Sequence, residues 1–118
     1  MANKRQIKKR IQYVCGQMAA EILMAQFIVS GIKDEDVNRI VCNIAALQSE
    51  AIGHVSVSFD KVPRDFAQPG EYARARRAYY RAAFARLKED FASAATDIVK
   101  QMNEAVPEDQ RKLIASLG

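Results

Sequence analysis

The chain has 118 residues, a formal net charge of +4, and few glycines (5) and prolines (3) among many alanine and charged residues. This length fits a single domain over residues 1–118, and the composition favours helix over strand. The two cysteines, Cys15 and Cys42, are too few for a disulfide framework and form no CxxC motif, so a disulfide-stapled scaffold is excluded and a cytoplasmic location is expected.

The first predicted element is a helix over residues 4–30, ended by Gly31. The run ILMAQFIV, residues 22–29, is far shorter than the ~20 residues of a membrane span. The basic N-terminal stretch is not followed by the apolar block of a signal peptide, so none is expected. Apolar residues recur at helical spacing along one face: Ile7, Ile11, Val14, Cys15, Met18, Ile22, Ala25 and Val29.

From residue 23 to residue 28 the apolar character spreads around the whole first helix. Two interpretations stay open. Either a partner covers this part of the helix, or the second half of the third helix and the last helix cover it within the monomer. The partner-interface candidates are Leu23, Met24, Phe27 and Ile28.

The second predicted helix begins at Asp34, a favourable N-cap with acidic residues behind it. The segment HVSVSF, residues 54–59, alternates and is compatible with a short strand. A lone strand has no partner in this chain, however, so we favour helix to about residue 60. The predicted stripe is Val37, Ile40, Val41, Ile44, Leu47, Gln48, Ala51 or Ile52, Val55 and Phe59.

Residues 60–70 form the predicted loop, with Phe66 as an anchor that folds back. The third helix is expected from near Pro69 to about Ala105. A short last helix follows Pro107, with Leu113, Ile114 and Leu117 packing back. The apolar stripe of the third helix is Ala73, Tyr80, Phe84, Leu87, Phe91, Ala94, Ile98 and Met102.

These elements predict an all-α fold, an elongated antiparallel three-helix bundle with a short C-terminal fourth helix. About 36 residues of helix span roughly 54 Å, whereas a compact chain of this length has a radius of gyration of only ~13–14 Å. A bundle this elongated covers its apolar stripes poorly by itself. We therefore expect a homodimer that completes the core, with a further protein partner as a possibility.

The basic residues are distributed unevenly. Residues 1–10 carry a net charge of +5, residues 60–81 carry +3, and the remainder carries −4. An up-down-up arrangement brings the two basic segments, residues 4–10 and 61–81, to one pole. The candidates for binding nucleic acid or another polyanion are Lys4, Arg5, Lys8, Lys9, Arg74, Arg77, Arg81 and Lys88.

Two interpretations of the basic pole stay open. It binds phosphates, with Tyr72 or Tyr79 stacking on a base, or it pairs with carboxylates of neighbouring helices or of a second copy. The second is favoured, because no helix-turn-helix, RNP, KH or zinc-finger pattern is present. Arg76 falls within the apolar sector of its helix, where it must reach out to solvent or meet a carboxylate.

The sequence indicates no catalytic residue, no metal site and no cofactor. His54 is the single histidine, with Glu50 one turn before it, and a helical di-metal site needs an ExxH pair on each of two helices. No nucleophile elbow, P-loop or glycine-rich dinucleotide loop occurs. Both cysteines lie on or beside apolar stripes and are expected to be buried free thiols. We expect a self-associating interaction or scaffolding module rather than an enzyme.

The opening KRQIKKRIQYVCG, the helical 34–52 segment and LKEDF late in the third helix together resemble small bacterial all-helical proteins of uncharacterised function. The resemblance covers most of the chain without any catalytic or binding motif. It implies a bacterial, cytosolic, all-helical protein, and it transfers no activity and no site residue.

Overall fold

The computed structural model describes residues 3–117, except for the side chains of residues 114, 115 and 117. Within this range the chain forms four α-helices, α1 (Lys4–Ile28), α2 (Asp34–Val55), α3 (Glu71–Ala105) and α4 (Glu108–Leu117), and a short 3₁₀-helix, η1 (Pro63–Asp65). No β-strand occurs in the described residues. The predicted all-α bundle is therefore confirmed.

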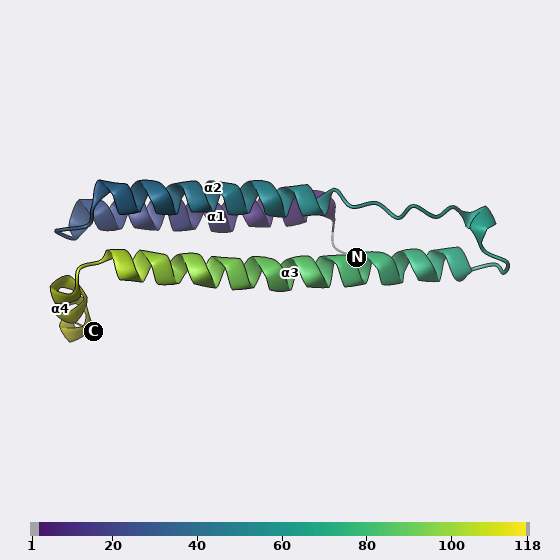
Figure 1. The fold of residues 1–118 in the computed structure, drawn as a ribbon. Coiled ribbons are helices and arrows are strands. Elements are labelled where there is room, and N and C mark those ends of the chain that lie inside the picture. Colours follow the sequence, from purple (N-terminus) through teal and green to yellow (C-terminus); the bar gives the residue numbers. More distant parts are fainter. Residues whose placement is uncertain (1–2, 118) are drawn as a thin grey trace.

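The three long helices run antiparallel in chain order, and α4 turns across one end (Figure 1). The molecule measures 66 × 25 × 18 Å and has a radius of gyration of 19.9 Å, well above the ~13–14 Å of a compact chain of this length. The predicted elongation is confirmed. No described helix is both long enough and apolar enough to cross a membrane.

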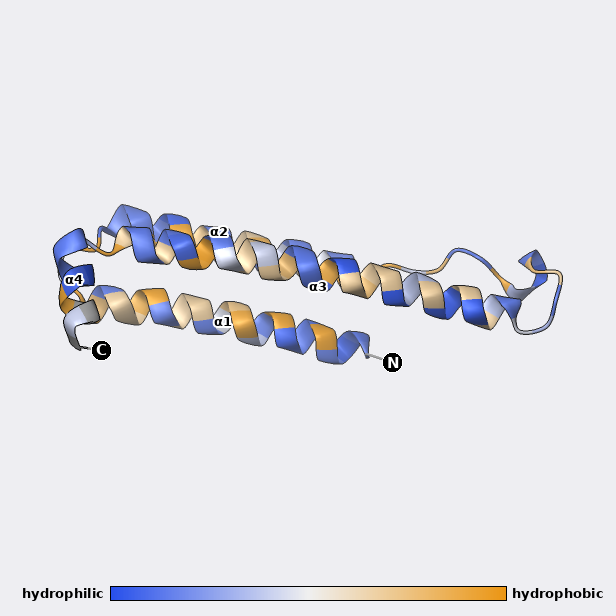
Figure 2. Ribbon diagram, turned by 90° about the horizontal axis from the view of Figure 1, so that it is seen from below, coloured by the Kyte–Doolittle hydropathy of each residue, from blue (hydrophilic) through white to orange (hydrophobic). Residues whose placement is uncertain are grey.

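The core is a narrow seam centred on α2, which packs against both α1 and α3. Ile22, Ile40 and Val55 are almost completely buried. Within each helix the buried residues follow the apolar stripe, which Figure 2 shows as orange bands. Only three residues of α3 are buried, against five of the shorter α2, so α3 contributes less to the core. The three residues of α3 are Tyr80, Leu87 and Ile98.

Polar side chains make different contacts at the starts of α1 and α2. The side chain of Asn3 caps α1 by accepting a 2.8 Å hydrogen bond from the Arg5 amide. The predicted N-cap of α2 is wrong by one residue: Lys33 is the N-cap, and Asp34 is the first helical residue. Instead of capping, the Asp34 carboxylate accepts a hydrogen bond from the side-chain amide of Gln26 on α1. This hydrogen bond joins the end of α1 to the start of α2 across the turn.

α2 ends at Val55, so the predicted continuation to about residue 60 is wrong. The Ser56 amide bonds to the carbonyl of Gly53 and closes the helix, and the residues after it are irregular. Phe59 does not continue the helical stripe. Its amide donates a 3.2 Å hydrogen bond to the Tyr80 hydroxyl, and its ring packs on aromatic residues of α3. Contacts with α3 therefore replace the last turn of the helix.

The loop keeps its predicted anchor, because the Phe66 ring lies 6.4 Å from that of Phe59 and 5.9 Å from that of Tyr72. α3 begins at Glu71 behind Gly70, whose φ of 87° suits glycine, and ends at Ala105 as predicted. The side chain of Leu113 on α4 does not pack back as expected, since it is 54% exposed. The expected contacts of Ile114 and Leu117 lie outside the described side chains.

Candidate functional site

The second half of α1 presents large apolar side chains to solvent. Phe27 is 92% exposed, Ile28 71%, Met24 63% and Leu23 53%. The alternative that α3 and α4 cover these residues within the monomer is therefore wrong. Contiguous exposed apolar surface of this kind marks interaction sites in folded proteins. We call these four residues the apolar collar.

A groove separates α1 from α3 along the open side of the bundle. Its first part has a volume of about 560 Å³, and its apolar wall comes from Ile11 and Val14 on α1 and Phe84 and Phe91 on α3. Ala85 and Ala92 on α3 are too small to fill the space between the two helices. The charged groups Arg10 and Lys88 also line it.

The groove continues towards the α4 end of the molecule. The second part, about 440 Å³, lies between Met18 and Glu21 on α1 and Ala95 and Val99 on α3. Val14 borders both parts, so they form one continuous surface. The groove was not predicted from the sequence. The only available signal was the alanine run on the edge of α3, and alanine alone does not distinguish a close helix contact from a gap.

At the opposite end, α3 extends beyond the start of α1 (Figure 1). The Lys4 ammonium donates a 2.8 Å hydrogen bond to the Val57 carbonyl and lies 5.4 Å from the centre of the Tyr80 ring. Residues 56–79, which we call the tip, therefore project past α1. The predicted pole therefore has two parts. The bases of α1 extend from Lys4, at the level of Tyr80, to Arg10, at the level of Lys88, whereas Arg74 and Arg77 lie farther out on the tip.

Aromatic side chains hold the tip together. The Phe59 ring lies 5.8 Å from that of Tyr72 and 5.4 Å from that of Tyr79. Tyr79 continues the series to Tyr80, at 5.3 Å. Tyr72 and Tyr79, the two tyrosines expected to stack on a base if the pole binds phosphates, thus already contact Phe59. Arg76, placed by the sequence in the apolar sector, lies over the Tyr80 ring at 5.0 Å.

The eight polyanion candidates are at the surface, with seven exposed and Lys8 partly buried. Within the described chain, the ion pairs are Arg39–Asp36, His54–Glu50, Arg86–Asp90 and Lys112–Glu108. None of the eight pairs with a carboxylate there. The positive charge of this end is therefore not neutralised by partners within the described residues.

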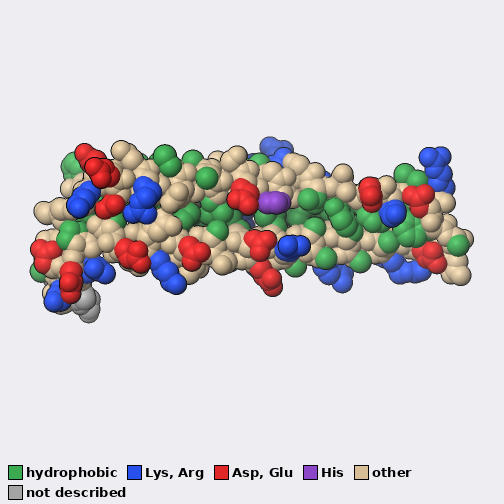
Figure 3. Space-filling view, in the orientation of Figure 1, with side chains coloured by type: hydrophobic (Ala, Val, Ile, Leu, Met, Phe, Trp, Pro, Cys, Tyr) green, Lys and Arg blue, Asp and Glu red, His purple; other side chains and the backbone are tan. Residues whose placement is uncertain are grey.

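Charge is segregated along the whole 66 Å axis. Leu87, near the middle of α3, borders one hollow with Ile11 of α1 and another with His54 of α2. These three residues therefore lie at about the same height along the long axis. Residues 3–11 and 55–88, on the tip side of this level, hold thirteen bases and three acids, a net charge of +10. Residues 12–54 and 89–117 hold five bases and eleven acids, a net charge of −6. Figure 3 shows acidic side chains gathered over the α4 half of one face.

His54 and Glu50 lie close together, as their spacing predicted. Their side chains approach to 3.8 Å, and both are exposed on α2. Nowhere in residues 3–117 do three His, Cys, Asp or Glu side chains group as metal ligands. The sequence indicates no catalytic or metal residue, and this pair gives no geometry from which to assign one.

The two cysteines differ in their surroundings. Cys15 is buried against the core, and its burial raises the pKa of the thiol. Cys42 is exposed, so its predicted burial is wrong. It lies two residues from both Ile40 and Ile44, and a step of two residues turns a helical side chain about 200° away from their buried face. Neither cysteine forms a disulfide.

Comparison of the chain with protein-family models, with curated protein sequences and with solved structures found no match in any of the three. The features that bear on function are therefore those of the molecule itself: the groove, the apolar collar and the basic tip.

Proposed function

We propose that the chain is a helical protein-interaction module that self-associates through the groove between α1 and α3 together with Met24 and Ile28 of the adjoining apolar collar. The observation that carries this proposal is the apolar surface left open on one side of the bundle, where Val14 joins two hollows of about 560 and 440 Å³. A second copy supplies the missing wall. A cytoplasmic location and a bacterial origin belong to the same proposal, and the exposed free thiol of Cys42 suits a reducing compartment.

The size of the surface supports a stable dimer. From Ile7 to Ile28 the α1 face is about 31 Å long, and two adjacent helices are about 20 Å wide. Such a face covers on the order of 600 Å² per copy, so that a dimer buries more than the ~1,000 Å² expected of a specific interface. The collar residues Met24 and Ile28 follow the same side of α1 beyond the groove and extend it.

Sedimentation velocity over a micromolar concentration range tests self-association. We expect the wild-type protein to be a dimer and the variant Met24→Glu/Ile28→Glu to be a monomer with unchanged helicity, because both side chains are exposed. Gln12→Glu is the control: it adds one negative charge to the same helix at an exposed position away from the groove. A wild-type monomer at every concentration overturns the proposal.

A second candidate function is polyanion binding at the tip and the adjacent start of α1. The observation that favours it is the set of exposed bases without carboxylate partners in the described chain, including Arg74, Arg77 and Arg81. Phosphate contacts of this kind make binding strongly salt-dependent. Nucleic acid is the polyanion to test first, because its backbone offers closely spaced phosphates to a group of exposed arginines.

Gel-shift titration with single- and double-stranded probes tests this candidate. Replacing Arg74, Arg77 and Arg81 with glutamine is expected to abolish a salt-sensitive shift. The matched control replaces Lys33, Lys100 and Arg111 with glutamine, which removes the same charge from the acidic half. If the wild-type protein shifts neither probe at low salt, nucleic-acid binding is rejected.

A further inference from the structure

We infer that the second copy binds antiparallel, with its acidic half against the basic half of the first. This inference rests on the proposed self-association and adds the orientation of the partner. The dimer has a two-fold axis perpendicular to the helices at the level of Val14, and α1 and α3 of both copies form a four-helix contact.

The charge distribution selects this orientation. The tip half carries +10 and the α4 half carries −6 over a molecule 66 Å long. An antiparallel pair sets each +10 half beside a −6 half. A parallel pair sets +10 beside +10, where like charges repel across the whole basic half. Salt screens charges that are more than about 8 Å apart, so the groups closest to the groove matter most.

The charged residues that line the groove have the same distribution, with bases at the tip end and an acid at the α4 end. The part nearer the tip is lined by Arg10 and Lys88, and the part nearer α4 is lined by Glu21. Val14 lies four residues after Arg10 and seven before Glu21, which corresponds to about 6 Å and about 10 Å along α1. A two-fold rotation at Val14 therefore brings Arg10 of one copy to within roughly one helical turn of Glu21 of the other.

Lys88 reaches the same partner residue from α3. It lines the tip-side part of the groove together with Arg10, so both cations face Glu21 of the second copy. Each two-fold dimer contains this cluster twice. In a parallel dimer Arg10 meets Arg10 and Glu21 meets Glu21, and neither contact is favourable.

Distance measurement between spin labels tests the orientation. A cysteine replaces Arg64, an exposed residue at the far end of the tip, in a Cys42→Ser background, and buried Cys15 stays unlabelled. The antiparallel dimer places the two labels at opposite ends of the assembly, at a separation comparable with the 66 Å molecular length. A parallel dimer places them within about 30 Å, two to three helix diameters.

Charge reversal supplies an independent readout on the same dimer. Glu21→Arg, and separately Arg10→Glu/Lys88→Glu, are each expected to raise the dimer Kd about fivefold or more, and mixing the two variants restores dimerisation. In a parallel dimer neither variant weakens its own homodimer, because one like-charge contact only replaces another. A dimer with the short label distance overturns the antiparallel arrangement alone, whereas a wild-type monomer overturns self-association as well.

Discussion

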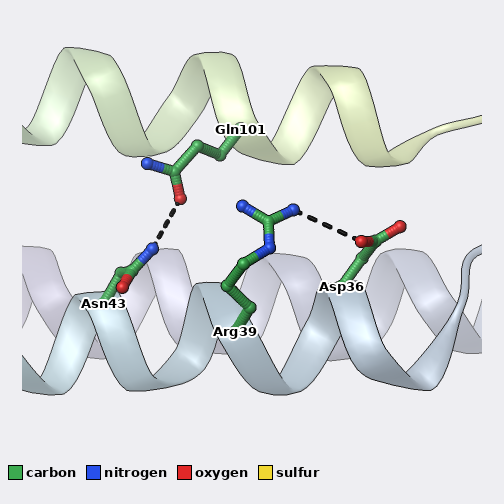
Figure 4. Close-up of polar contacts among 4 residues, drawn as sticks. All are labelled: Asp36, Arg39, Asn43 and Gln101. Atoms are coloured by element: carbon green, nitrogen blue, oxygen red, sulfur yellow. Dashed lines mark hydrogen bonds and ion pairs between the residues drawn. The ribbon is translucent and has the colours of Figure 1, made fainter.

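The side-chain amide of Asn43 on α2 donates a 2.8 Å hydrogen bond to the side-chain oxygen of Gln101 on α3 (Figure 4). Both residues are partly buried, so the bond forms where water has limited access. It joins positions 58 residues apart and lies one turn along α2 from the ion pair of Arg39 with Asp36. The bond thereby contributes to the register between the two helices.

Asn43→Ala is expected to lower the free energy of unfolding by about 1 kcal/mol, the net contribution of one such hydrogen bond. A double-mutant cycle with Gln101→Ala, measured by urea denaturation, isolates the coupling between the two side chains. Asn38→Ala, at an exposed position of α2, serves as the control and stays within about 0.5 kcal/mol of wild type. Additive effects of the two changes contradict a role in register.

Gly31→Ala is expected to destabilise the protein for two reasons. Gly31 has a φ of 92°, which an alanine adopts only with strain, and a Cβ there lies 2.9 Å from Cγ of Pro107. Gly16→Ala is the matched control, because it lies inside α1 with nothing within 4 Å of its added Cβ. We expect this control to stabilise the helix by about 0.5–1 kcal/mol. Thermal unfolding measures both, and equal shifts of the two Tm values contradict the prediction.

Tyr80→Phe is expected to loosen the tip while leaving the bundle folded. The ring remains, but the Phe59 amide loses the hydroxyl that accepts its 3.2 Å hydrogen bond. The expected cost is about 1 kcal/mol, seen as faster amide hydrogen exchange over residues 56–66. Tyr79→Phe, whose ring also packs on Phe59, is the control and leaves exchange there unchanged. Unchanged exchange in Tyr80→Phe rules out the hydroxyl as the tether.

The two thiols are expected to differ in reactivity and in their effect on alkaline stability. Cys42 reacts with a thiol reagent in the native protein, whereas buried Cys15 reacts only when the protein unfolds. Burial raises the pKa of Cys15 from its ordinary value of 9.0, so above about pH 9 the unfolded chain loses this proton first. Its contribution to stability is therefore complete below pH 9 and declines as the pH rises.

Denaturant unfolding at pH 7 and pH 10 tests whether burial of Cys15 lowers the free energy of unfolding as the pH rises. The loss of stability between the two pH values is expected to be smaller for Cys15→Ala than for wild type. Cys42→Ser is the control, because it removes the exposed thiol and leaves the buried one in place. Equal pH dependence in wild type and Cys15→Ala contradicts the assignment.

Much of the helical structure could be predicted from local pattern. The steps from Ile11 to Cys15, Met18 and Ile22 place these residues on one face of α1, and all four are buried. Gly31 is predictable as a terminator because few other residues adopt its conformation. The end of α2 was not predictable in this way. Val55 and Phe59 have helical spacing, and the aromatic contacts that draw Phe59 away come from α3, more than ten residues later in the sequence.

Local sequence is sufficient to predict the all-helical class, the apolar face of each long helix and the excess of positive charge in residues 4–10 and 61–81, because each of these is a property of neighbouring residues. Two features depend on how the helices pack: α3 extends past α1 at Lys4, and a groove lies between α1 and α3. The distance between two helices depends on side chains from both and on the helix that packs against them. Ala85 and Ala92 face Ile11 and Val14 across the groove, and the spacing of residues within one helix does not predict how far apart these two helices lie.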